Sequence, residues 1–101
     1  MRKISEEAVQ NCMDAIPFKE SNTQVIVHDN VTVLSLFGNE IAFFFNDPER
    51  TIEIRNCGWK SATTKERLNA IRGVNISQKK GIWYLNGREW DGNLINIESN
   101  K

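Results

Sequence analysis

The chain contains few of the residues that build catalytic and metal centres. Its 101 residues include one histidine and two cysteines, Cys12 and Cys57. Two cysteines cannot form a disulfide framework, and in a reducing compartment we expect them to pack as small hydrophobic side chains. One histidine and two separated cysteines are too few and too dispersed to bind zinc. Neither a calcium-binding acidic loop nor a nucleotide-binding glycine motif occurs. We expect no metal and no cofactor.

Long apolar runs are also lacking. No segment is apolar over the length needed to cross a bilayer, and the N-terminus turns acidic at Glu6 and Glu7, where a signal peptide would turn apolar. These features predict a cytoplasmic protein that makes no membrane contact. With 40% hydrophobic and 26% charged residues, the composition predicts one globular domain over residues 1–101.

The two halves of the chain differ in charge, although the net charge is zero. Residues 1–56 hold five Lys or Arg against nine Asp or Glu, and residues 57–101 hold eight against four. Such a split also occurs on ordinary solvated surfaces, but it leaves the C-terminal half able to meet an acidic partner.

The N-terminal segment has the pattern of an amphipathic helix. Ser5 is a suitable N-cap, and Pro17 would stop the helix. Apolar residues recur between them with helical spacing, at Val9, Cys12, Met13 and Ile16. The pattern predicts one buried stripe.

Residues 24–55 alternate between apolar and polar side chains, which is typical of strands. Asp29–Asn30 and Gly38–Asn39 stand where two-residue hairpin turns belong. If both form such turns, Phe37 pairs with Glu40 and the register is set along the strands. The face predicted to be buried then carries Val25, Val27, Leu34, Leu36, Ile41, Phe43 and Phe45.

The opposite face of this sheet is predicted to be mixed in polarity. It would carry Ile26, His28, Val31, Val33, Ser35, Phe37, Glu40, Ala42 and Phe44. This face is too apolar to meet water throughout. We therefore expect the C-terminal segment or another chain to cover part of it, which would allow a homodimer.

A second helix is predicted to begin at Thr63, which forms a capping box with Glu66. Leu68 and Ile71 would be its buried side, and Gly73 suits the position after its end. Its exposed side would present Lys65, Asn69 and Arg72.

A hairpin is predicted after this helix. The chain returns over residues 74–77, turns at Lys79–Gly81 and reaches Asn86–Gly87, a strong type I′ turn signal that places Trp83 opposite Trp90. A short last strand over residues 94–97 is also expected. The complete pattern predicts an α+β fold with an N-terminal helix, a four-stranded antiparallel meander, a second helix and a C-terminal β-hairpin.

Nucleophilic catalysis would require the single histidine, His28, to lie beside a cysteine or a serine. The segment Cys57–Trp59 lacks the second cysteine of a cysteine-protease centre, and His28 precedes it where such enzymes have the histidine far downstream. We therefore expect no enzymatic activity.

The start of the second helix is a candidate anion site. Backbone N–H groups at a helix N-terminus carry partial positive charge, and lysines flank this segment. The residues that would surround the anion are Gly58, Ser61, Thr63 and Thr64. The alternative is that these hydroxyl groups only cap the helix, because Ser and Thr are common cap residues.

The C-terminal half also contains the candidate residues for a partner. Trp83 and Trp90 would either stabilise the hairpin as a cross-strand pair or, if exposed, form an interface hot spot. Lys79 and Lys80 at the neighbouring turn would favour an acidic partner. The candidate partner-binding residues are Lys60, Lys65, Asn69, Arg72, Lys79, Lys80, Trp83, Arg88 and Trp90.

A motif of the form Gly-Trp-x-Ser-x-Thr-Thr-Lys-x-Arg-Leu-Asn begins at Gly58 and is followed by a Gln-Lys-Lys-Gly-x-Trp-Tyr hairpin at residues 78–84. With these motifs, residues 28–85 resemble a group of small tailed-bacteriophage proteins. The resemblance implies a phage origin and assigns no reaction.

Two functions are compatible with these observations. The first is a phage accessory protein that binds a host protein or protein complex, for example as an anti-CRISPR type inhibitor, or that sequesters a small signalling molecule. The second is a nucleic-acid-binding module, although zero net charge argues against it because phosphate neutralisation supplies most non-specific affinity. This module would use Lys60, Lys65, Arg67, Lys79 and Lys80 with Trp83.

Overall fold

The computed structural model describes residues 3–97, which form two helices and nine strands. Helix α1 spans Lys3–Met13 and helix α2 spans Ala62–Asn69. The larger sheet has the strand order β1-β2-β3-β4-β5-β9 and the smaller one β6-β7-β8, with all neighbours antiparallel. The strands are β1 (Phe18–Glu20), β2 (Thr23–Val27), β3 (Val31–Leu36), β4 (Asn39–Phe45), β5 (Ile52–Ile54), β6 (Ile76–Lys79), β7 (Ile82–Leu85), β8 (Arg88–Glu89) and β9 (Ile95–Asn96).

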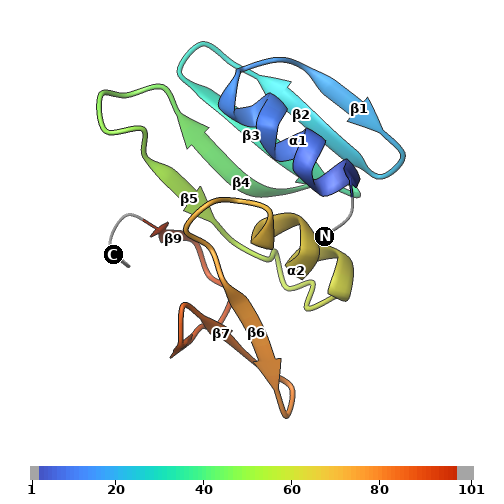
Figure 1. Cartoon of the computed structure of the whole chain (residues 1–101), viewed down its shortest axis with the longest axis vertical. Helices are drawn as coiled ribbons and strands as arrows, with labels where there is room; N and C mark the ends of the chain where they lie inside the picture. Colours follow the sequence, from blue (N-terminus) through green and yellow to red (C-terminus); the bar gives the residue numbers. More distant parts are fainter. Residues whose placement is uncertain (1–2, 98–101) are drawn as a thin grey trace.

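Both helices lie on the same side of the larger sheet (Figure 1). Helix α1 packs on β2 and β3, and α2 packs on α1, β4 and β6. The smaller sheet extends from the α2 end of the molecule (Figure 1). The predicted α+β class is confirmed, and the expected last strand over residues 94–97 is present as β9. The larger sheet has six strands instead of the predicted four, because β1 precedes the meander and β9 joins its other edge, and β8 follows the predicted Asn86–Gly87 turn as the third strand of the smaller sheet. Neither helix of residues 3–97 is long and apolar enough to span a bilayer.

Helix α1 begins before Ser5, so the prediction that Ser5 is its N-cap is wrong. The Ser5 side chain is instead fully buried. Val9 and Cys12 of the predicted stripe are buried, whereas Met13 and Ile16 are about half exposed. The stripe is shorter than predicted because α1 ends at Met13 and Ala15, with a φ of +54°, breaks the helical conformation before Ile16.

The predicted turn at Asp29–Asn30 is confirmed. Val27 pairs with Thr32, and the backbone N–H of His28 donates a 2.9 Å hydrogen bond to the carbonyl of Val31. This geometry is that of a two-residue hairpin. It gives β2 and β3 the predicted register.

The second predicted turn is displaced by one residue. The turn residues are Phe37–Gly38, so Leu36 pairs with Asn39. Both turn residues have positive φ, 53° for Phe37 and 81° for Gly38. Positive φ at two successive positions matches the right-handed twist of a hairpin, although a bulky residue rarely adopts it.

A β-bulge in β4 then changes which phenylalanine faces the core. The register with β3 shifts opposite Ile41, which is the extra residue of the bulge. Ala42 and Phe44 are therefore buried in the core, while Phe43 and Phe45 lie half-buried on the other face. The prediction that Phe43 and Phe45 belong to the core is wrong, because a one-residue shift exchanges the two faces of a strand.

The face of the larger sheet that points away from the two helices carries the half-buried Phe43. The guanidinium of Arg55 lies 5.1 Å from the centre of the Phe43 ring. The C-terminal segment was expected to cover this face, but up to residue 97 it joins the sheet edge as β9, paired with β5. A homodimer through this face stays a prediction.

The N-cap of α2 is Ser61, two residues before the predicted Thr63. The backbone N–H of Thr64 donates to the Ser61 hydroxyl oxygen at 3.1 Å, which satisfies one of the free donors of the first turn. The capping box with Thr63 is therefore wrong. Leu68 and Ile71 are buried as predicted, and Gly73 follows the helix with a φ of +92°.

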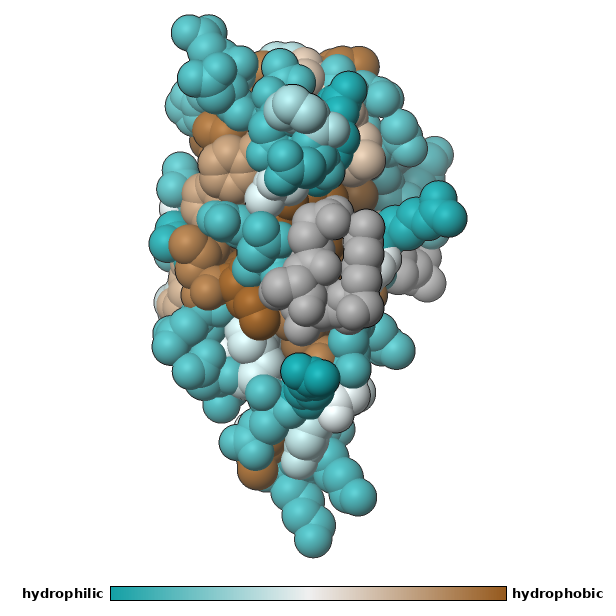
Figure 2. Space-filling model, turned by 90° about the vertical axis from the view of Figure 1, so that its left-hand side faces the viewer, coloured by the Kyte–Doolittle hydropathy of each residue, from teal (hydrophilic) through white to brown (hydrophobic). Residues whose placement is uncertain are grey.

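The smaller sheet buries the tryptophan pair. Leu85 pairs with Arg88 across the Asn86–Gly87 turn, as predicted, and the N–H of Trp90 donates to the carbonyl of Trp83 at 2.9 Å. The other end of this sheet is the β6–β7 turn. It forms the lower tip of the molecule, which is mostly hydrophilic, whereas apolar side chains gather near the middle of this view (Figure 2).

Candidate functional site beside the start of α2

Phe37 stands at the turn between β3 and β4 with most of its side chain in solvent. Its exposed fraction is 70%, the highest among the large hydrophobic residues described. The backbone N–H of Phe37 donates a 2.8 Å hydrogen bond to the carbonyl of Asn22, in the turn between β1 and β2. The backbone of this turn is thus anchored while the ring is left free.

Trp59 lies in the loop between β5 and α2 and is 60% exposed. This loop is held by Asn56, whose side-chain oxygen accepts a 2.8 Å hydrogen bond from the N–H of Gly58 and whose carbonyl accepts one of 2.9 Å from the N–H of Trp59. Asn56 is itself buried. The indole of Trp59 is therefore presented from a fixed loop.

An apolar hollow of about 430 Å³ lies between these two aromatic residues. The buried side chains of Leu36 and Ile41 contribute apolar wall, and Thr63 from α2 lies on another side. No charged residue lines the hollow, which is surrounded by Leu36, Phe37, Asn39, Ile41, Asn56, Trp59, Ser61, Thr63 and Thr64. We call it the aromatic hollow.

A second, smaller hollow of about 270 Å³ lies on the other side of Phe37. Most of the residues that line it are of polar types, and Lys19 is the one charged residue among them. Phe37 belongs to the lining of both hollows. No carboxylate lines either hollow, so no negatively charged lining residue would repel an acidic ligand.

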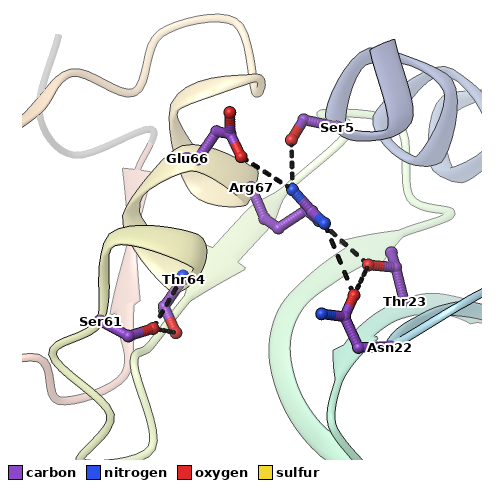
Figure 3. Close-up of polar contacts among 7 residues, drawn as sticks. All are labelled: Ser5, Asn22, Thr23, Ser61, Thr64, Glu66 and Arg67. Carbon is purple, nitrogen blue, oxygen red and sulfur yellow. Dashed lines mark hydrogen bonds and ion pairs between the residues drawn. The ribbon is translucent and has the colours of Figure 1, made fainter. Parts of the chain in front are cut away.

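The four predicted anion-site residues gather at this place but are largely engaged with one another or with the loop. The N–H of Gly58 is bonded to Asn56, and the N–H of Thr64 is bonded to Ser61. The hydroxyl groups of Ser61 and Thr64 are also 3.0 Å apart (Figure 3). These contacts show that the hydroxyl groups of Ser61 and Thr64 are used within the start of the helix. Ser61 and Thr63 also line the aromatic hollow.

The predicted basic residues do not all share one surface. Lys65 on α2 donates a 3.1 Å hydrogen bond to the side-chain oxygen of Gln78 on β6. Since successive side chains of a strand point to opposite faces, Lys79 lies on the other face of the smaller sheet. Lys80 is exposed in the turn that follows.

Three of the other candidate partner residues have structural contacts. The Asn69 side chain bonds the backbone of Ile76 in both directions, at 2.6 Å and 3.1 Å, and so ties α2 to β6. Trp83 and Trp90 are 0% and 6% exposed, with ring centres 6.2 Å apart. Their burial favours the cross-strand pair over an exposed hot spot. The remaining candidates are exposed: Lys60, Arg72 and Arg88.

Arg67, which belonged to the nucleic-acid hypothesis, is 1% exposed. Its guanidinium donates hydrogen bonds to the hydroxyls of Ser5 at 2.8 Å and Thr23 at 3.0 Å, and to the carboxylate of Glu66 at 3.1 Å (Figure 3). A longer contact of 3.5 Å reaches the side chain of Asn22. The guanidinium therefore joins α2 to α1 and to the start of β2, and is not available to a phosphate.

Cys12 and His28 line a third hollow, between the end of α1 and the sheet. Burial raises the pKa of the Cys12 thiol to about 12, which keeps it protonated near neutral pH. The thiol of Cys57 is remote from this hollow and donates to the carbonyl of Glu40 at 3.1 Å. Among residues 3–97 no cluster of three His, Cys, Asp or Glu side chains is placed to hold a metal ion.

Sequence reasoning missed Phe37 and Arg67. Phe37 was assigned to a strand because Gly38–Asn39 is also an acceptable turn sequence. The only signal for the actual turn was the position of Phe37 directly before a glycine. Arg67 precedes Ile71 by four residues and follows Thr64 by three, which places it on the buried side of α2. That spacing could have identified it as a buried arginine.

Comparisons with known proteins identify the family of the chain. Searches of curated proteins and of solved structures give no match. The family model that does match confirms the phage origin that the motifs beginning at Gly58 implied. It is described as Kyanoviridae Gp96 protein and covers residues 1–99, so the chain belongs to this family of phage proteins.

Proposed function

We propose that this phage protein binds a host protein or protein complex and inhibits or modulates it by stoichiometric binding, acting in the cytoplasm of the host cell. Inhibition of a defence system, for example in the manner of an anti-CRISPR protein, is one concrete form of such binding. The protein works as a binding module and not as an enzyme.

One observation carries this proposal: Phe37 and Trp59 are the two most exposed large hydrophobic residues described, and both border one apolar hollow. In the free protein, two exposed aromatic side chains contribute no stabilising free energy from burial of their apolar surface. Aromatic side chains around a preformed apolar hollow are typical of protein interfaces, where they supply most of the binding energy.

The nucleic-acid alternative receives less support. Two members of its residue set, Arg67 and Trp83, are buried. Lys65 on α2 bonds Gln78, whereas Lys79 points to the other face of the smaller sheet, so the two lysines do not form one basic stripe. With a net charge of zero, the protein also lacks the general attraction to phosphate on which non-specific binding depends.

The test is affinity isolation from host lysate with the immobilised protein, followed by reconstitution with the purified partner. The Phe37→Ala/Trp59→Ala double variant serves as the matched control, because both side chains are exposed and their removal should leave the melting temperature nearly unchanged. We expect a stoichiometric complex with the wild type that inhibits or alters the activity of the partner.

The same proteins are then titrated with random DNA and RNA over a series of salt concentrations. Strong binding that weakens steeply with salt, together with the absence of any protein partner, would contradict the proposal and favour the nucleic-acid alternative.

A further inference from the structure

The most specific feature of the candidate site is its combination of shape and charge. The aromatic hollow is lined by apolar side chains and neutral polar groups, and its volume of about 430 Å³ is in the range of sites that enclose a small ligand or a large side chain. An exposed cation, Lys60, lies next to this lining, and the lining itself contains no carboxylate. A ligand with an apolar group flanked by acidic groups would match both the apolar lining and the positive charge beside it.

One exposed lysine lies next to the aromatic hollow, and another lies on the opposite face of the larger sheet. Lys60 is exposed between Trp59 and Ser61, which both line the hollow. Lys19 is exposed in the smaller hollow, in one cross-strand row with Gln24, Ser35 and Glu40, so its side chain points to the sheet face opposite that of Leu36. Among residues 3–97, the side chain of neither lysine has a hydrogen-bond or ion-pair partner.

The first turn of α2 adds partial positive charge at the same place. The N-cap is Ser61, and the helix dipole is directed so that its positive end lies at this residue. Lys60 and the start of α2 therefore place positive charge beside an apolar hollow, while the hollow itself offers dispersion contacts and no charge.

We propose that the aromatic hollow takes one aromatic or large aliphatic side chain from an acidic segment of the partner, whose neighbouring carboxylates lie against Lys60 and the start of α2. This inference rests on the proposed function and names the chemistry of the partner segment. The apolar side chain supplies the binding energy, and the carboxylates select the segment and accelerate its association.

Three synthetic pentapeptides with blocked ends test this inference. One has Phe between two pairs of Asp, the second has Ala between the same pairs, and the third has Phe between two pairs of Lys. Each is titrated into the ¹⁵N-labelled full-length protein, up to about 5 mM, because one anchor side chain provides only weak affinity.

We expect the first peptide to shift the amide signals of Phe37 and Thr63 and the indole N–H signal of Trp59. The Ala peptide should bind about tenfold more weakly, as truncation of an anchor residue does. The Lys peptide should bind at least about threefold more weakly, and added salt should reduce this difference. Shifts that are absent from these residues, or equal for all three peptides, would overturn the inference.

Variants separate the two parts of the inference. Trp59→Ala should weaken the first peptide about tenfold, and Lys60→Glu should remove its advantage over the Lys peptide. Ile82→Ala is the matched control, because Ile82 is an exposed apolar residue in the smaller sheet, among the residues that line neither hollow. An effect of Ile82→Ala equal to that of Trp59→Ala would also overturn the inference.

Failure of this inference is distinguishable from failure of the proposed function. If the protein forms a complex with a purified host partner that Phe37→Ala and Trp59→Ala leave unchanged, the binding function stands and the role of the aromatic hollow is wrong. If no host protein binds at all, the proposed function itself is wrong.

Discussion

The guanidinium of Arg67 donates a 2.8 Å hydrogen bond to the hydroxyl of Ser5, 62 positions earlier in the chain. Both side chains are buried, so this bond joins the two helices inside the protein. The same guanidinium also bonds Thr23, beside the turn whose Asn22 carbonyl holds the N–H of Phe37. Arg67 thus connects the helices to the turn that presents one wall of the aromatic hollow.

Replacement of Arg67 by Met should destabilise the protein by about 3 to 5 kcal/mol, because the buried partners of the guanidinium lose their hydrogen bonds. Urea unfolding followed by circular dichroism measures this loss. Arg72→Met is the matched control on an exposed position and should stay within about 0.5 kcal/mol. Equal effects of the two variants would show that the buried contacts contribute little.

Gly92→Ala should destabilise more than Gly73→Ala, although both glycines have a φ near +90°. A Cβ atom at Gly92 would overlap the side-chain amide of Asn56, whereas one at Gly73 would have no neighbour within 4 Å. Left-handed strain alone should cost about 1 to 2 kcal/mol in both variants, and the overlap should add at least about 1 kcal/mol to Gly92→Ala. Thermal unfolding of the two variants measures the difference, and its absence would mean that Asn56 can move aside.

Phe44→Ala should cost about 3 to 5 kcal/mol, as for a large buried side chain, and Phe43→Ala about 1 to 2 kcal/mol. Phe44 is in the core, whereas Phe43 is half-buried under Arg55 on the open face. Denaturant unfolding of the two variants compares them directly. A larger loss for Phe43→Ala would place the bulge in β4 elsewhere.

Cys12 should be almost inert to thiol reagents in the folded protein. With its pKa raised to about 12 by burial, only about one thiol in ten thousand is ionised at pH 8. A chromogenic disulfide reagent should therefore label Cys57 alone until denaturant is added, and Cys57→Ser should abolish labelling of the folded protein. Because the unfolded chain loses the Cys12 proton near pH 9 while the folded chain keeps it, this group lowers stability as pH rises between about 9 and 12.

Charge reversal at two exposed lysines should show whether the partner contacts the aromatic hollow or the tip of the smaller sheet. At low ionic strength, Lys60→Glu should slow association with the partner several-fold, whereas Lys80→Glu should leave it within about twofold of the wild type. Both residues are exposed, so neither change should alter the melting temperature much. A larger effect of Lys80→Glu in surface plasmon resonance would favour the basic hairpin as the contact surface.

Local patterns were sufficient to predict the elements whose signals are short-range. The Asn86–Gly87 turn was found because its residues tolerate the positive φ that both adopt, and the Asp29–Asn30 turn because Asp and Asn favour turns. Helix α2 was found from its hydroxyl-rich start and apolar spacing. The bulge at Ile41 was not predicted, because nothing near it in the sequence marks the extra residue. That one shift moved Phe43 and Phe44 between faces.

The candidate site was only half predictable for a similar reason. Trp59 lies within the motif that begins at Gly58, so it could be considered together with the start of α2. Phe37 lies 22 positions earlier and joins Trp59 only because α2 packs on β4. The tertiary contact that creates the hollow leaves no pattern in either segment alone.

The pairing of β5 with β9 determines when the larger sheet can be completed during synthesis of the chain. Ile54 pairs with Ile95, so the outermost strand of the larger sheet is supplied by residues made about forty positions after its neighbour. While the ribosome is still adding α2 and the smaller sheet, the edge of β5 has unpaired backbone groups that other chains can meet. The larger sheet becomes complete only after residues 95 and 96 have been synthesised.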